Sequence, residues 1–439
     1  MLLRHVSITN TQSTNDCPET KTILSRPSPF PDNATMRELK DPNANTNGIN
    51  GHIDTDHATS NMPDSSNAWS TSGSAAFDFR SDTVTSPTSS MLAATQHCTL
   101  LDDVFQEDQT TLSLESFIAD LTGKETSLFV ISGTMGNQLS VRTHLGGPPH
   151  SVIADARSHV LEWEAGGIAS LSGAMPIPIT PTNGHHITPA DIETHTILST
   201  DHHFAPTRLI CLENTLGGTI LPLKDCQEIA QWAHAQTPSI PLHLDGARLW
   251  EAVAAGAGSL KDYCACFDSV TMCFSKGLGA PIGSIICSTT TFINRARHLR
   301  KMLGGGLRQA GVITASARVS VDETFLGGKL SATHTRAREV ADMWVTKGGK
   351  LAQPTETNMV WLDLSAINCS TEKLIEAGVK EGLKLLGGRV VVHYQVCDEA
   401  VKALGRVMDA ILPTQSKEIG HVSDGVREKA KEVGDIDME

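Results

Sequence analysis

The stretch DSVTMCFSKGLGAPIGSIICS, residues 268–288, places one lysine, Lys276, between two apolar runs. A buried ammonium group is costly unless it is paired, neutralised or covalently used. Such a lysine therefore indicates either a site of chemistry or, as the alternative, a solvated surface turn between two strands. This stretch alone leaves both readings open.

Two other apolar runs also end in residues that suit a binding site. In the stretch IPLHLDGARLW the apolar run ends at Asp245, and Arg248 follows three residues later. The run VISGTMGN turns at Gly133 and Thr134 into a helical pattern, and the free N–H groups of a helix start attract phosphate. Taken singly, Asp245 could be a helix N-cap and the Gly-Thr pair a simple connection.

The order of these three features is more specific than any one of them. Gly133 comes first, Asp245 second and Lys276 third, each after a strand-like run. Ligands of parallel α/β sheets bind at the carboxyl ends of the strands. The sequence therefore predicts a single site formed by an anion cradle, an aspartate and a lysine.

The surrounding elements alternate between short apolar strands and amphipathic helices, as expected for an α/β fold with a mostly parallel sheet covered on both faces. A helix is expected at 114–123, ending at a glycine. Strands are expected at 126–132, 150–155, 207–214, 240–247, 267–275 and 283–288.

Composition divides the chain into four parts. Residues 1–76 are polar and are predicted to be a disordered N-terminal extension. Residues 77–329 form the predicted large domain, and 330–412 a small C-terminal α+β domain. Residues 413–439 are a charged tail.

The whole-chain composition excludes several classes of protein. The 439 residues carry a net charge of −14 without a basic cluster, which argues against nucleic-acid binding. No apolar run reaches the roughly 20 residues of a membrane span. The ten cysteines include no C-x-x-C pair, so we expect no metal site and a reducing, cytoplasmic location.

Eight motifs of this sequence closely resemble those of the low-specificity L-threonine aldolases. They are FRSDTVTSP, DDVFQED, SGTMGNQ, EAGG, LENT, HLDGAR, SKGLGAPIGS and RKMLGGGLRQAG, and the likeness runs from about residue 77 to about 412. That family has the fold-type-I architecture of pyridoxal 5′-phosphate (PLP) enzymes. The resemblance implies cleavage of a small β-hydroxy-α-amino acid, such as L-threonine or L-allo-threonine, to glycine and an aldehyde.

The resemblance also implies how the cofactor is held. Lys276 would bind the PLP aldehyde as a Schiff base, so that its amine is not left buried and charged. Asp245 would pair with the pyridine nitrogen and keep the ring an electron sink. Gly133 and Thr134 would bind the phosphate, and His159 would stack on the ring. Without the resemblance, the sequence indicates that His159 is a histidine on the surface of a helix.

The substrate side of the predicted site contains five residues. Ser81, Arg248 and Arg389 match the family's binders of the substrate carboxylate, and Arg248 would also contact the cofactor. His159 and His203 are the candidate bases, and the sequence does not choose between them. For Arg389, a solvated strand-edge position is the alternative.

A glycine-rich loop is expected near a subunit boundary. Lys301 and Arg308 flank its three glycines, and the resemblance places Arg308 near the phosphate of a neighbouring subunit. A solvated basic turn is the alternative. We therefore expect a homodimer or homotetramer with shared active sites.

The match departs from the family pattern around the side-chain pocket. Phe105 and Gln106 replace tyrosine and glycine, Leu216 replaces a common histidine, and Leu161 replaces a common tyrosine. Because polar groups near a β-hydroxyl are lost, an amino-acid (alanine) racemase of the same family is the alternative activity. A pseudoenzyme is disfavoured, since a scaffold would not need Lys276, Asp245, His159 and Arg248 together.

Overall fold

The structure is a computed structural model that describes residues 68–412. Residues 1–67 of the predicted extension and the predicted tail, 413–439, lie outside the described residues. Residues 68–76 were predicted to belong to the extension but are described, and a short 3-10 helix, η2, spans Gly73–Phe77.

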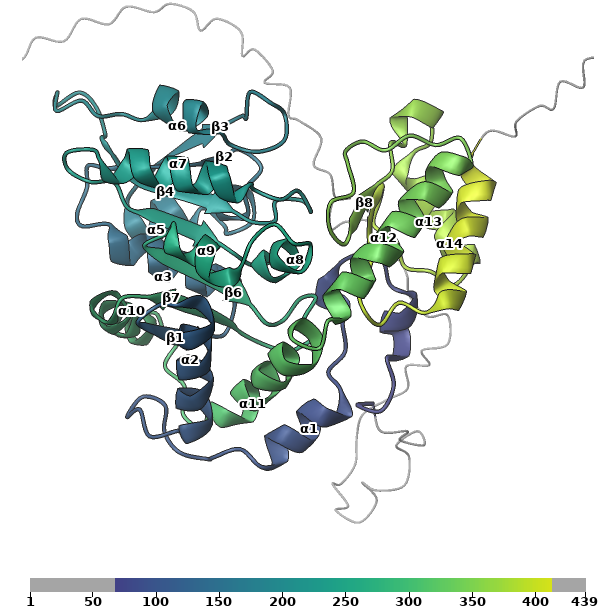
Figure 1. Ribbon diagram of the computed structural model, residues 1–439, viewed down its shortest axis with the longest axis horizontal. Helices are drawn as coiled ribbons and strands as arrows, with labels where there is room; N and C mark the ends of the chain where they lie inside the picture. Colours follow the sequence, from purple (N-terminus) through teal and green to yellow (C-terminus); the bar gives the residue numbers. More distant parts are fainter. Residues whose placement is uncertain (1–67, 413–439) are drawn as a thin grey trace, which may run out of the picture. The chain divides into compact units, whose positions relative to one another are not determined.

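A seven-stranded sheet dominates the described chain, and the prediction of a mostly parallel sheet is confirmed (Figure 1). Only β7 runs antiparallel to its neighbours in this sheet. The carboxyl ends of the other six strands therefore lie along one edge. In spatial order the strands are β1 (Thr126–Val130), β7 (Ser284–Ser288), β6 (Ser269–Cys273), β5 (Leu242–Asp245), β4 (Thr207–Glu213), β2 (Ser151–Asp155) and β3 (Met175–Ile179).

Strand β3 was missed by the sequence reading. Its sequence, MPIPI, contains Pro176 and Pro178, which cannot donate to a sheet ladder. The strand pairs only with β2 and forms the edge of the sheet, where the missing donors can be tolerated.

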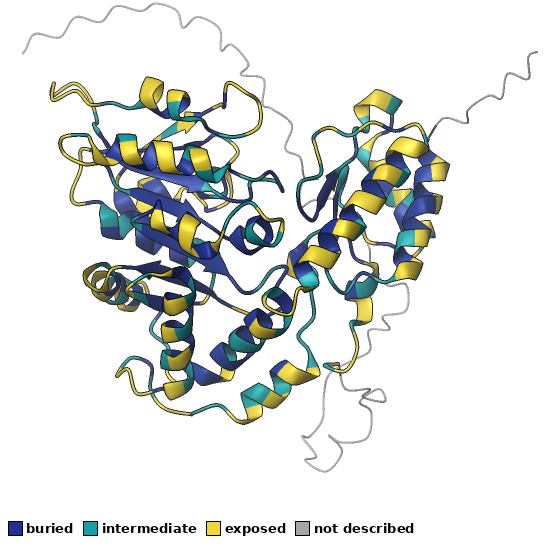
Figure 2. Cartoon of the chain, viewed as in Figure 1, coloured by how far each residue is buried: buried dark blue, intermediate teal, exposed yellow. Residues whose placement is uncertain are grey.

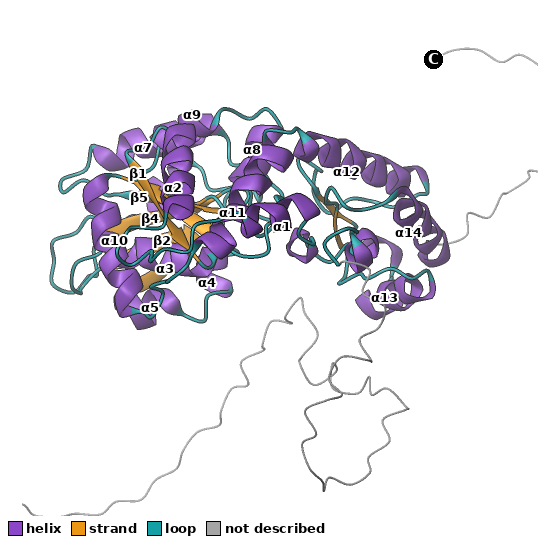
Figure 3. Ribbon diagram, turned by 90° about the horizontal axis from the view of Figure 1, so that it is seen from below, coloured by secondary structure: helices purple, strands orange, loops and turns teal. Residues whose placement is uncertain are grey.

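Helices cover both faces of the sheet, as Figure 3 shows. On one face lie α2 (Gln109–Thr122), α7 (Leu223–His234), α8 (Leu249–Ala254) and α9 (Leu260–Ala265). On the other face lie α3 (Gly133–His144), α4 (His159–Glu162), α5 (Gly167–Ser172) and α10 (Thr290–Met302). Helix α2 ends at Gly123, whose φ of 70° suits a left-handed C-cap, as expected. Except for the edge strand β3, the strands between these layers are almost wholly buried (Figure 2).

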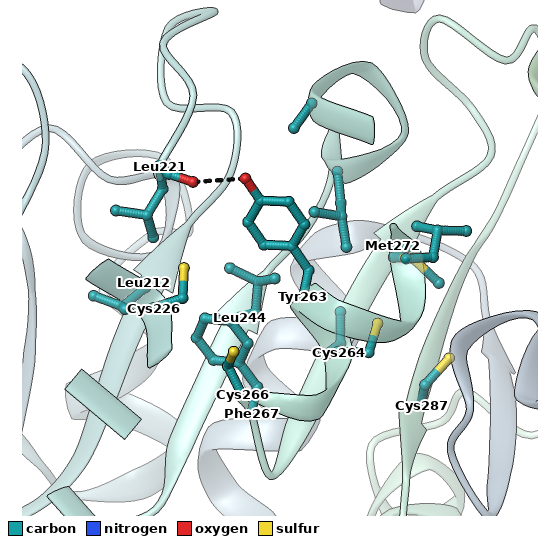
Figure 4. Packing of buried hydrophobic residues seen from close by; sticks show 14 of the residues in the cluster. Leu212, Leu221, Cys226, Leu244, Tyr263, Cys264, Cys266, Phe267, Met272 and Cys287 are labelled. Atoms are coloured by element: carbon teal, nitrogen blue, oxygen red, sulfur yellow. Dashed lines mark hydrogen bonds between the residues drawn. The ribbon is translucent and has the colours of Figure 1, made fainter. Parts of the chain in front are cut away.

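The largest apolar core lies under the first of these layers. Figure 4 shows Tyr263 of α9 among Leu244, Met272 and Phe267, with its hydroxyl donating to the carbonyl of Leu221 at 2.9 Å. Burying each large side chain of this kind contributes about 1.5–3 kcal/mol. This core fixes β5 and β6, the strands that lead into Asp245 and Lys276.

A second core forms around a two-stranded antiparallel sheet, β8 (Met359–Trp361) and β9 (Arg389–Val391). Phe79, from the start of the described chain, belongs to this core and bonds to Lys384 and Val391 through its backbone. The segment that follows it is thereby brought beside β9. The helices of this part are α12 (Lys329–Thr346), α13 (Thr371–Lys380) and α14 (Asp398–Ile411), with the 3-10 turn η5 (Ser365–Ile367).

The remaining elements connect these parts. They are the 3-10 helix η3 (Asp82–Val84), α1 (Ser89–Gln96), α6 (Pro189–His195), α11 (Gly311–Ser320) and a single π-helical turn, η4 (Val321–Phe325). Helix α1 packs on α11, and η4 leads into α12. None of the described helices is both long and apolar enough to cross a lipid bilayer.

Candidate active site

The carboxyl edge of the sheet gathers the predicted lysine and aspartate. Asp245 is the last residue of β5 and lies in register with Glu213 at the end of β4. Lys276 lies in the turn after β6, and its carbonyl accepts from the hydroxyl of Thr85 at 3.0 Å. Among the described residues none forms a hydrogen bond or ion pair with Lys276 Nζ, although its charge acts on Asp82 and Glu213.

The Asp245 carboxylate is buried and held at both oxygens. Its Oδ2 accepts from Asn137 Nδ2 at 2.7 Å, and its Oδ1 accepts from the backbone N–H of Ala247 at 3.1 Å. Asn137 lies on α3, so the helix that covers β5 fixes the side chain at the strand end. A carboxylate held in this way could accept a further N–H from a cationic ring.

His159 lies beside this carboxylate. Its Nδ1 is 2.8 Å from Oε1 of buried Glu164, which also accepts from Asn137 at 2.8 Å and, at Oε2, from Gln138 at 2.6 Å. Ligand atoms of His159, Glu164 and Asp245 all lie within 4.8 Å of one another. The Glu164 carboxylate accepts hydrogen bonds from the amides of Asn137 and Gln138, so it also favours an N–H donor at His159 Nδ1. In that tautomer Nε2 of His159 is unprotonated and can accept a proton.

Glu213 adds a third carboxyl group to this edge. Its Oε2 accepts from the backbone N–H of His159 at 2.8 Å. Burial, followed by the charge of Asp245, raises the pKa of Glu213 to about 8, although Lys276 and Arg248 act in the opposite direction. Glu213 also lines a small cleft together with Leu216.

The start of α3 leaves backbone donors open. Ser132 caps the helix by accepting from the N–H of Met135 at 3.1 Å. The N–H groups of Gly133 and Thr134 belong to the first turn, so no carbonyl of α3 lies four residues before them to accept their hydrogen bonds. A Cβ at Gly133 would lie 2.8 Å from Cys273 Sγ, so only glycine lets the helix start this close to β6.

The three predicted carboxylate binders are also brought together. Arg248 grips buried Asp82 with two hydrogen bonds, Nε to Oδ2 at 2.7 Å and an Nη to Oδ1 at 2.6 Å. The hydroxyl of the preceding residue, Ser81, lies 3.5 Å from the same Oδ1 of Asp82. Arg389 donates to the carbonyl of Arg80 at 3.1 Å, and it lies close enough to Arg248 for that charge to shift its pKa.

The charges of this group are strongly coupled. Burial raises the pKa of Asp82, but the neighbouring guanidinium of Arg248 outweighs burial and holds that pKa well below its usual range. Burial and then the charge of Arg248 lower the pKa of Arg389. The charges of Arg248 and Arg389 thus both act near Asp82, and guanidinium groups suit the binding of a further carboxylate.

His203 lies elsewhere in the chain. It precedes β4, its side chain is 72% exposed, and its Nδ1 bonds to Asp201 at 2.6 Å. Because β4 has seven residues, its two ends are roughly 20 Å apart at about 3.3 Å per residue. The structure therefore brings His159, but not His203, to the Lys276 site of the same chain.

The glycine-rich loop forms a separate basic surface. Arg308 is 61% exposed and bonds to Asp102 at 2.7 Å. Lys301 lines an open cleft of about 890 Å³ with Arg297, His298 and Arg300. Within residues 68–412 of one chain, no hydrogen bond or ion pair joins Arg308 or Lys301 to the Lys276 turn.

The residues around Lys276 fit PLP. The PLP aldehyde requires an amine, and Lys276 supplies one that has no partner among the described residues. The pyridine nitrogen requires a carboxylate acceptor, which is Asp245, and the phosphate requires the unpaired N–H groups of a helix start. The absence of a side chain at Gly133 keeps the phosphate cradle open toward β6. Lys276, Asp245, Gly133 and Thr134 are therefore the residues that could hold this cofactor.

Four residues of the site were missed in the sequence: Asp82, Asn137, Glu164 and Glu213. Each lies inside a motif noted above, in FRSDTVTSP, SGTMGNQ, EAGG and LENT. Their partners are distant in sequence, and Asn137 and Asp245 are 108 positions apart. The motifs could have suggested these residues, but not which side chain each one holds.

Comparison with known proteins gives a consistent result. The model of a family described as beta-eliminating lyases matches residues 78–367. The chain is 60% identical over 344 residues to aldolase vrtJ of Penicillium aethiopicum, covering 78% of this chain and 87% of the relative. It is 45% identical to a probable low-specificity L-threonine aldolase of Schizosaccharomyces pombe, with coverage of 78% and 89%. It is also 44% identical to alanine racemase TOXG of Cochliobolus carbonum, with coverage of 79% and 90%.

Solved structures agree on the fold. A putative L-allo-threonine aldolase from Listeria monocytogenes matches with a TM-score of 0.62 and 22% identity, covering 76% of this chain and 96% of that chain. A structure of SPT with PLP matches with a TM-score of 0.59 and 17% identity, covering 76% and 86%. The predicted fold-type-I architecture is therefore confirmed.

Proposed function

The chain belongs to the beta-eliminating lyase family, and from that premise we propose that it is a PLP-dependent aldehyde-lyase. Its reaction is the cleavage of a β-hydroxy-α-amino acid, L-threonine or L-allo-threonine, to glycine and an aldehyde. Threonine aldolases recur among its relatives at 42–45% identity. The observation that carries the proposal is the convergence of Lys276, Asp245 and the start of α3 at one edge of the sheet.

Each group of the cofactor has a residue to hold it. Lys276 would bind the aldehyde, Asp245 the ring nitrogen, and Gly133 and Thr134 the phosphate. When bound, PLP supplies an electron sink for the electron pair that is left on Cα when a bond to that carbon breaks. His159, half-exposed beside Asp245, is placed to contact the ring.

The substrate carboxylate is the next requirement. Arg248 and Arg389 supply the positive charge for it, with Ser81 as an additional hydroxyl donor. Arg248 is held rigid by Asp82, so little side-chain entropy is lost when it binds a carboxylate. A fixed carboxylate orients the Cα–Cβ bond, and orientation of this kind is a large part of catalysis.

Cleavage also needs a base for the β-hydroxyl proton. His159 is the candidate, because Glu164 fixes its Nδ1–H and leaves Nε2 as an acceptor. His203 precedes the amino end of β4, which is roughly 20 Å from the carboxyl end of that strand. Within one chain we therefore assign the base to His159 Nε2, directly or through water.

A racemase is the second candidate, favoured by the 44% identity to alanine racemase TOXG. Racemisation breaks Cα–H instead of Cα–Cβ on the same electron sink. The loss of polar groups at Leu161 and Leu216 removes contacts to a β-hydroxyl that a racemase would not need. The 60% identity to an aldolase and the recurring threonine aldolases favour cleavage.

We also propose a homodimer or homotetramer with shared sites. Large apolar side chains are exposed on the loops around the glycine-rich segment, namely Leu100, Leu101, Phe105, Met302 and Leu303. The basic cleft that contains Lys301 lies among them. A second copy would cover this apolar surface, and light scattering of the purified protein measures the assembly.

Two further assignments, the domain bounds and the cellular compartment, complete the proposal. We propose a large PLP-binding domain at 77–329 and a small domain at 330–412. The two cores agree with this division except that Phe79 packs in the second core and Leu330 in the first. The nine cysteines of the described chain are free thiols, which agrees with a reducing, cytoplasmic compartment.

One experiment separates the two activities. The PLP-loaded protein is incubated with L-threonine, L-allo-threonine and L-alanine, and acetaldehyde, glycine and D-alanine are measured. Acetaldehyde with an equal amount of glycine supports the aldolase. D-alanine without acetaldehyde would replace it with the racemase.

A further inference from the structure

A chain of buried hydrogen bonds runs behind Asp245, along the face of the sheet that α3 covers. Asn137 Oδ1 is 3.1 Å from His243 Nε2, and His243 Nδ1 is 2.8 Å from Ser269 Oγ. The same hydroxyl lies 2.7 Å from Nε2 of His144, at the carboxyl end of α3. The chain therefore spans the sheet from the Asp245 edge to the amino end of β6.

The direction of every bond in this chain follows from its active-site end. Asn137 Nδ2 faces Asp245 Oδ2 at 2.7 Å and Glu164 Oε1 at 2.8 Å, so this group is the amide donor and Oδ1 is the acceptor. His243 must then donate from Nε2 and accept at Nδ1, which makes Ser269 the donor to His243. The Ser269 oxygen in turn accepts from His144 Nε2–H.

Both histidines suit such a chain because they are neutral. Burial lowers the pKa of His243 to about 4, and burial together with His243 lowers the pKa of His144 to about 3. A neutral imidazole has one donor and one acceptor, so it can pass on the direction of a hydrogen bond. Bonds that are aligned in this way polarise one another.

We propose that Asn137, His243, Ser269 and His144 form a positioning relay that holds Asp245 and His159 together as one unit. Asn137 is the branch point, because its amide donates to Asp245 and to the Glu164 carboxylate that fixes His159. The relay rests on the proposed function, since it acts through the residues assigned to the cofactor and to the base. It goes beyond that function by assigning a role to four residues that touch neither the cofactor nor the substrate.

Other titratable groups surround the same aspartate, and the test must allow for them. Those facing Asp245 from neighbouring elements are Glu213 of β4, His159 and Glu164 of the α4–α5 segment, and Cys211 of β4. None of them bonds to His243 or Ser269, so the far end of the relay can be altered without touching them.

The test therefore starts at the far end, with Ser269→Ala. It leaves His243 Nδ1 without its donor, and we expect the pH midpoint of the visible band of bound PLP to shift and kcat to fall about five-fold, the size of one hydrogen bond. Ser127→Ala is the matched control, because Ser127 of β1 is equally buried but donates to the carbonyl of Glu115 on α2. Both variants should lose similar thermal stability. Equal spectra and equal kcat for the two variants would overturn the relay.

Asn137→Ala tests the branch point. Loss of two bonds to carboxylates should weaken PLP binding roughly ten- to hundred-fold. Asn137→Asp keeps the shape but removes the donor, so it should not restore binding. Wild-type affinity in Asn137→Asp would contradict the assigned donor.

A measurement on the cofactor-free protein keeps this inference separate from the proposed function. With ¹⁵N-labelled histidine, His243 should give the Nε2–H tautomer and His159 the Nδ1–H tautomer, assigned with His243→Gln and His159→Asn. The opposite tautomer at His243 would end the proposal even if the protein cleaves threonine. The expected tautomers in a protein that binds no PLP would leave the relay standing and remove the proposed function.

Discussion

The guanidinium of Arg248 is locked onto the carboxylate of Asp82 by two parallel hydrogen bonds, 2.7 and 2.6 Å long. These residues are 166 positions apart, and Asp82 is fully buried. The pair joins the segment that enters the second core to the strand end that contains Asp245. The position of Arg248, which we propose binds the substrate carboxylate, therefore depends on the position of the segment that contains Asp82.

Asp82→Asn should impair the substrate site more than the cofactor site. The amide removes the charge that holds Arg248, and a broken buried pair costs about 3–5 kcal/mol. We expect KM for threonine to rise at least ten-fold while the visible band of bound PLP persists. Steady-state kinetics and absorbance measure the two effects. Glu381→Gln, which releases exposed Arg406, is the control, and an equal rise in KM there would contradict the assignment.

Glu213→Gln should change how stability depends on pH. The pKa of Glu213 is raised from 4.5 to about 8 in the folded protein, so the folded state holds this proton more tightly than the unfolded state does. This contribution to stability is fully present below pH 4.5 and is lost as pH rises through about 8. Denaturant unfolding of the cofactor-free protein should show a flatter profile for Glu213→Gln between pH 5 and 8.

The control for this profile is Glu193→Gln, at an exposed position on α6. It should leave the wild-type slope unchanged. A Glu213→Gln profile that stays parallel to the wild type across this range would mean that Glu213 is already ionised at pH 5.

His159→Asn and His203→Asn should differ sharply. Loss of a general base costs about 10²- to 10⁴-fold in rate, and His159 lies beside Asp245 and Glu164. His203 is exposed at the opposite edge of the sheet, so His203→Asn should stay within about two-fold of the wild type. Single-turnover measurement of acetaldehyde release compares them. A large loss in His203→Asn would mean that His203 serves the site of another copy.

Gly133→Ala should close the phosphate cradle. The added Cβ would lie 2.8 Å from Cys273 Sγ, so the start of α3 must move. We expect PLP to bind at least ten-fold more weakly, as measured by absorbance titration. Cys273→Ala in the same chain should restore part of this affinity. Gly146→Ala, where the new Cβ meets nothing within 4 Å, should bind PLP normally.

Much of the fold could be read from local patterns. The predicted helix that ends at Gly123 and the strands that lead to Asp245 and Lys276 are present, because apolar runs and glycine caps are local signals. The edge strand β3 was not predicted, because its two prolines are more typical of a loop than of a strand. The antiparallel direction of β7 has no local signal at all, since pairing depends on the neighbouring strands.

The site was predictable in its residue types but not in its contacts. Lys276, Asp245 and Gly133 stand out by their position after apolar runs. By contrast, the bond from Asn137 to Asp245 and the fork between Asp82 and Arg248 join residues more than 100 positions apart. A single sequence contains no information on such pairs until the sheet brings them together.

The central claim is that the amine of Lys276 is the covalent anchor of PLP. The holoprotein is reduced with borohydride, digested, and its peptides are sequenced by mass spectrometry. The account predicts one phosphopyridoxyl group, attached to the peptide that contains Lys276, and none in Lys276→Ala. The same group attached to another lysine, or a visible band that survives in Lys276→Ala, would contradict it.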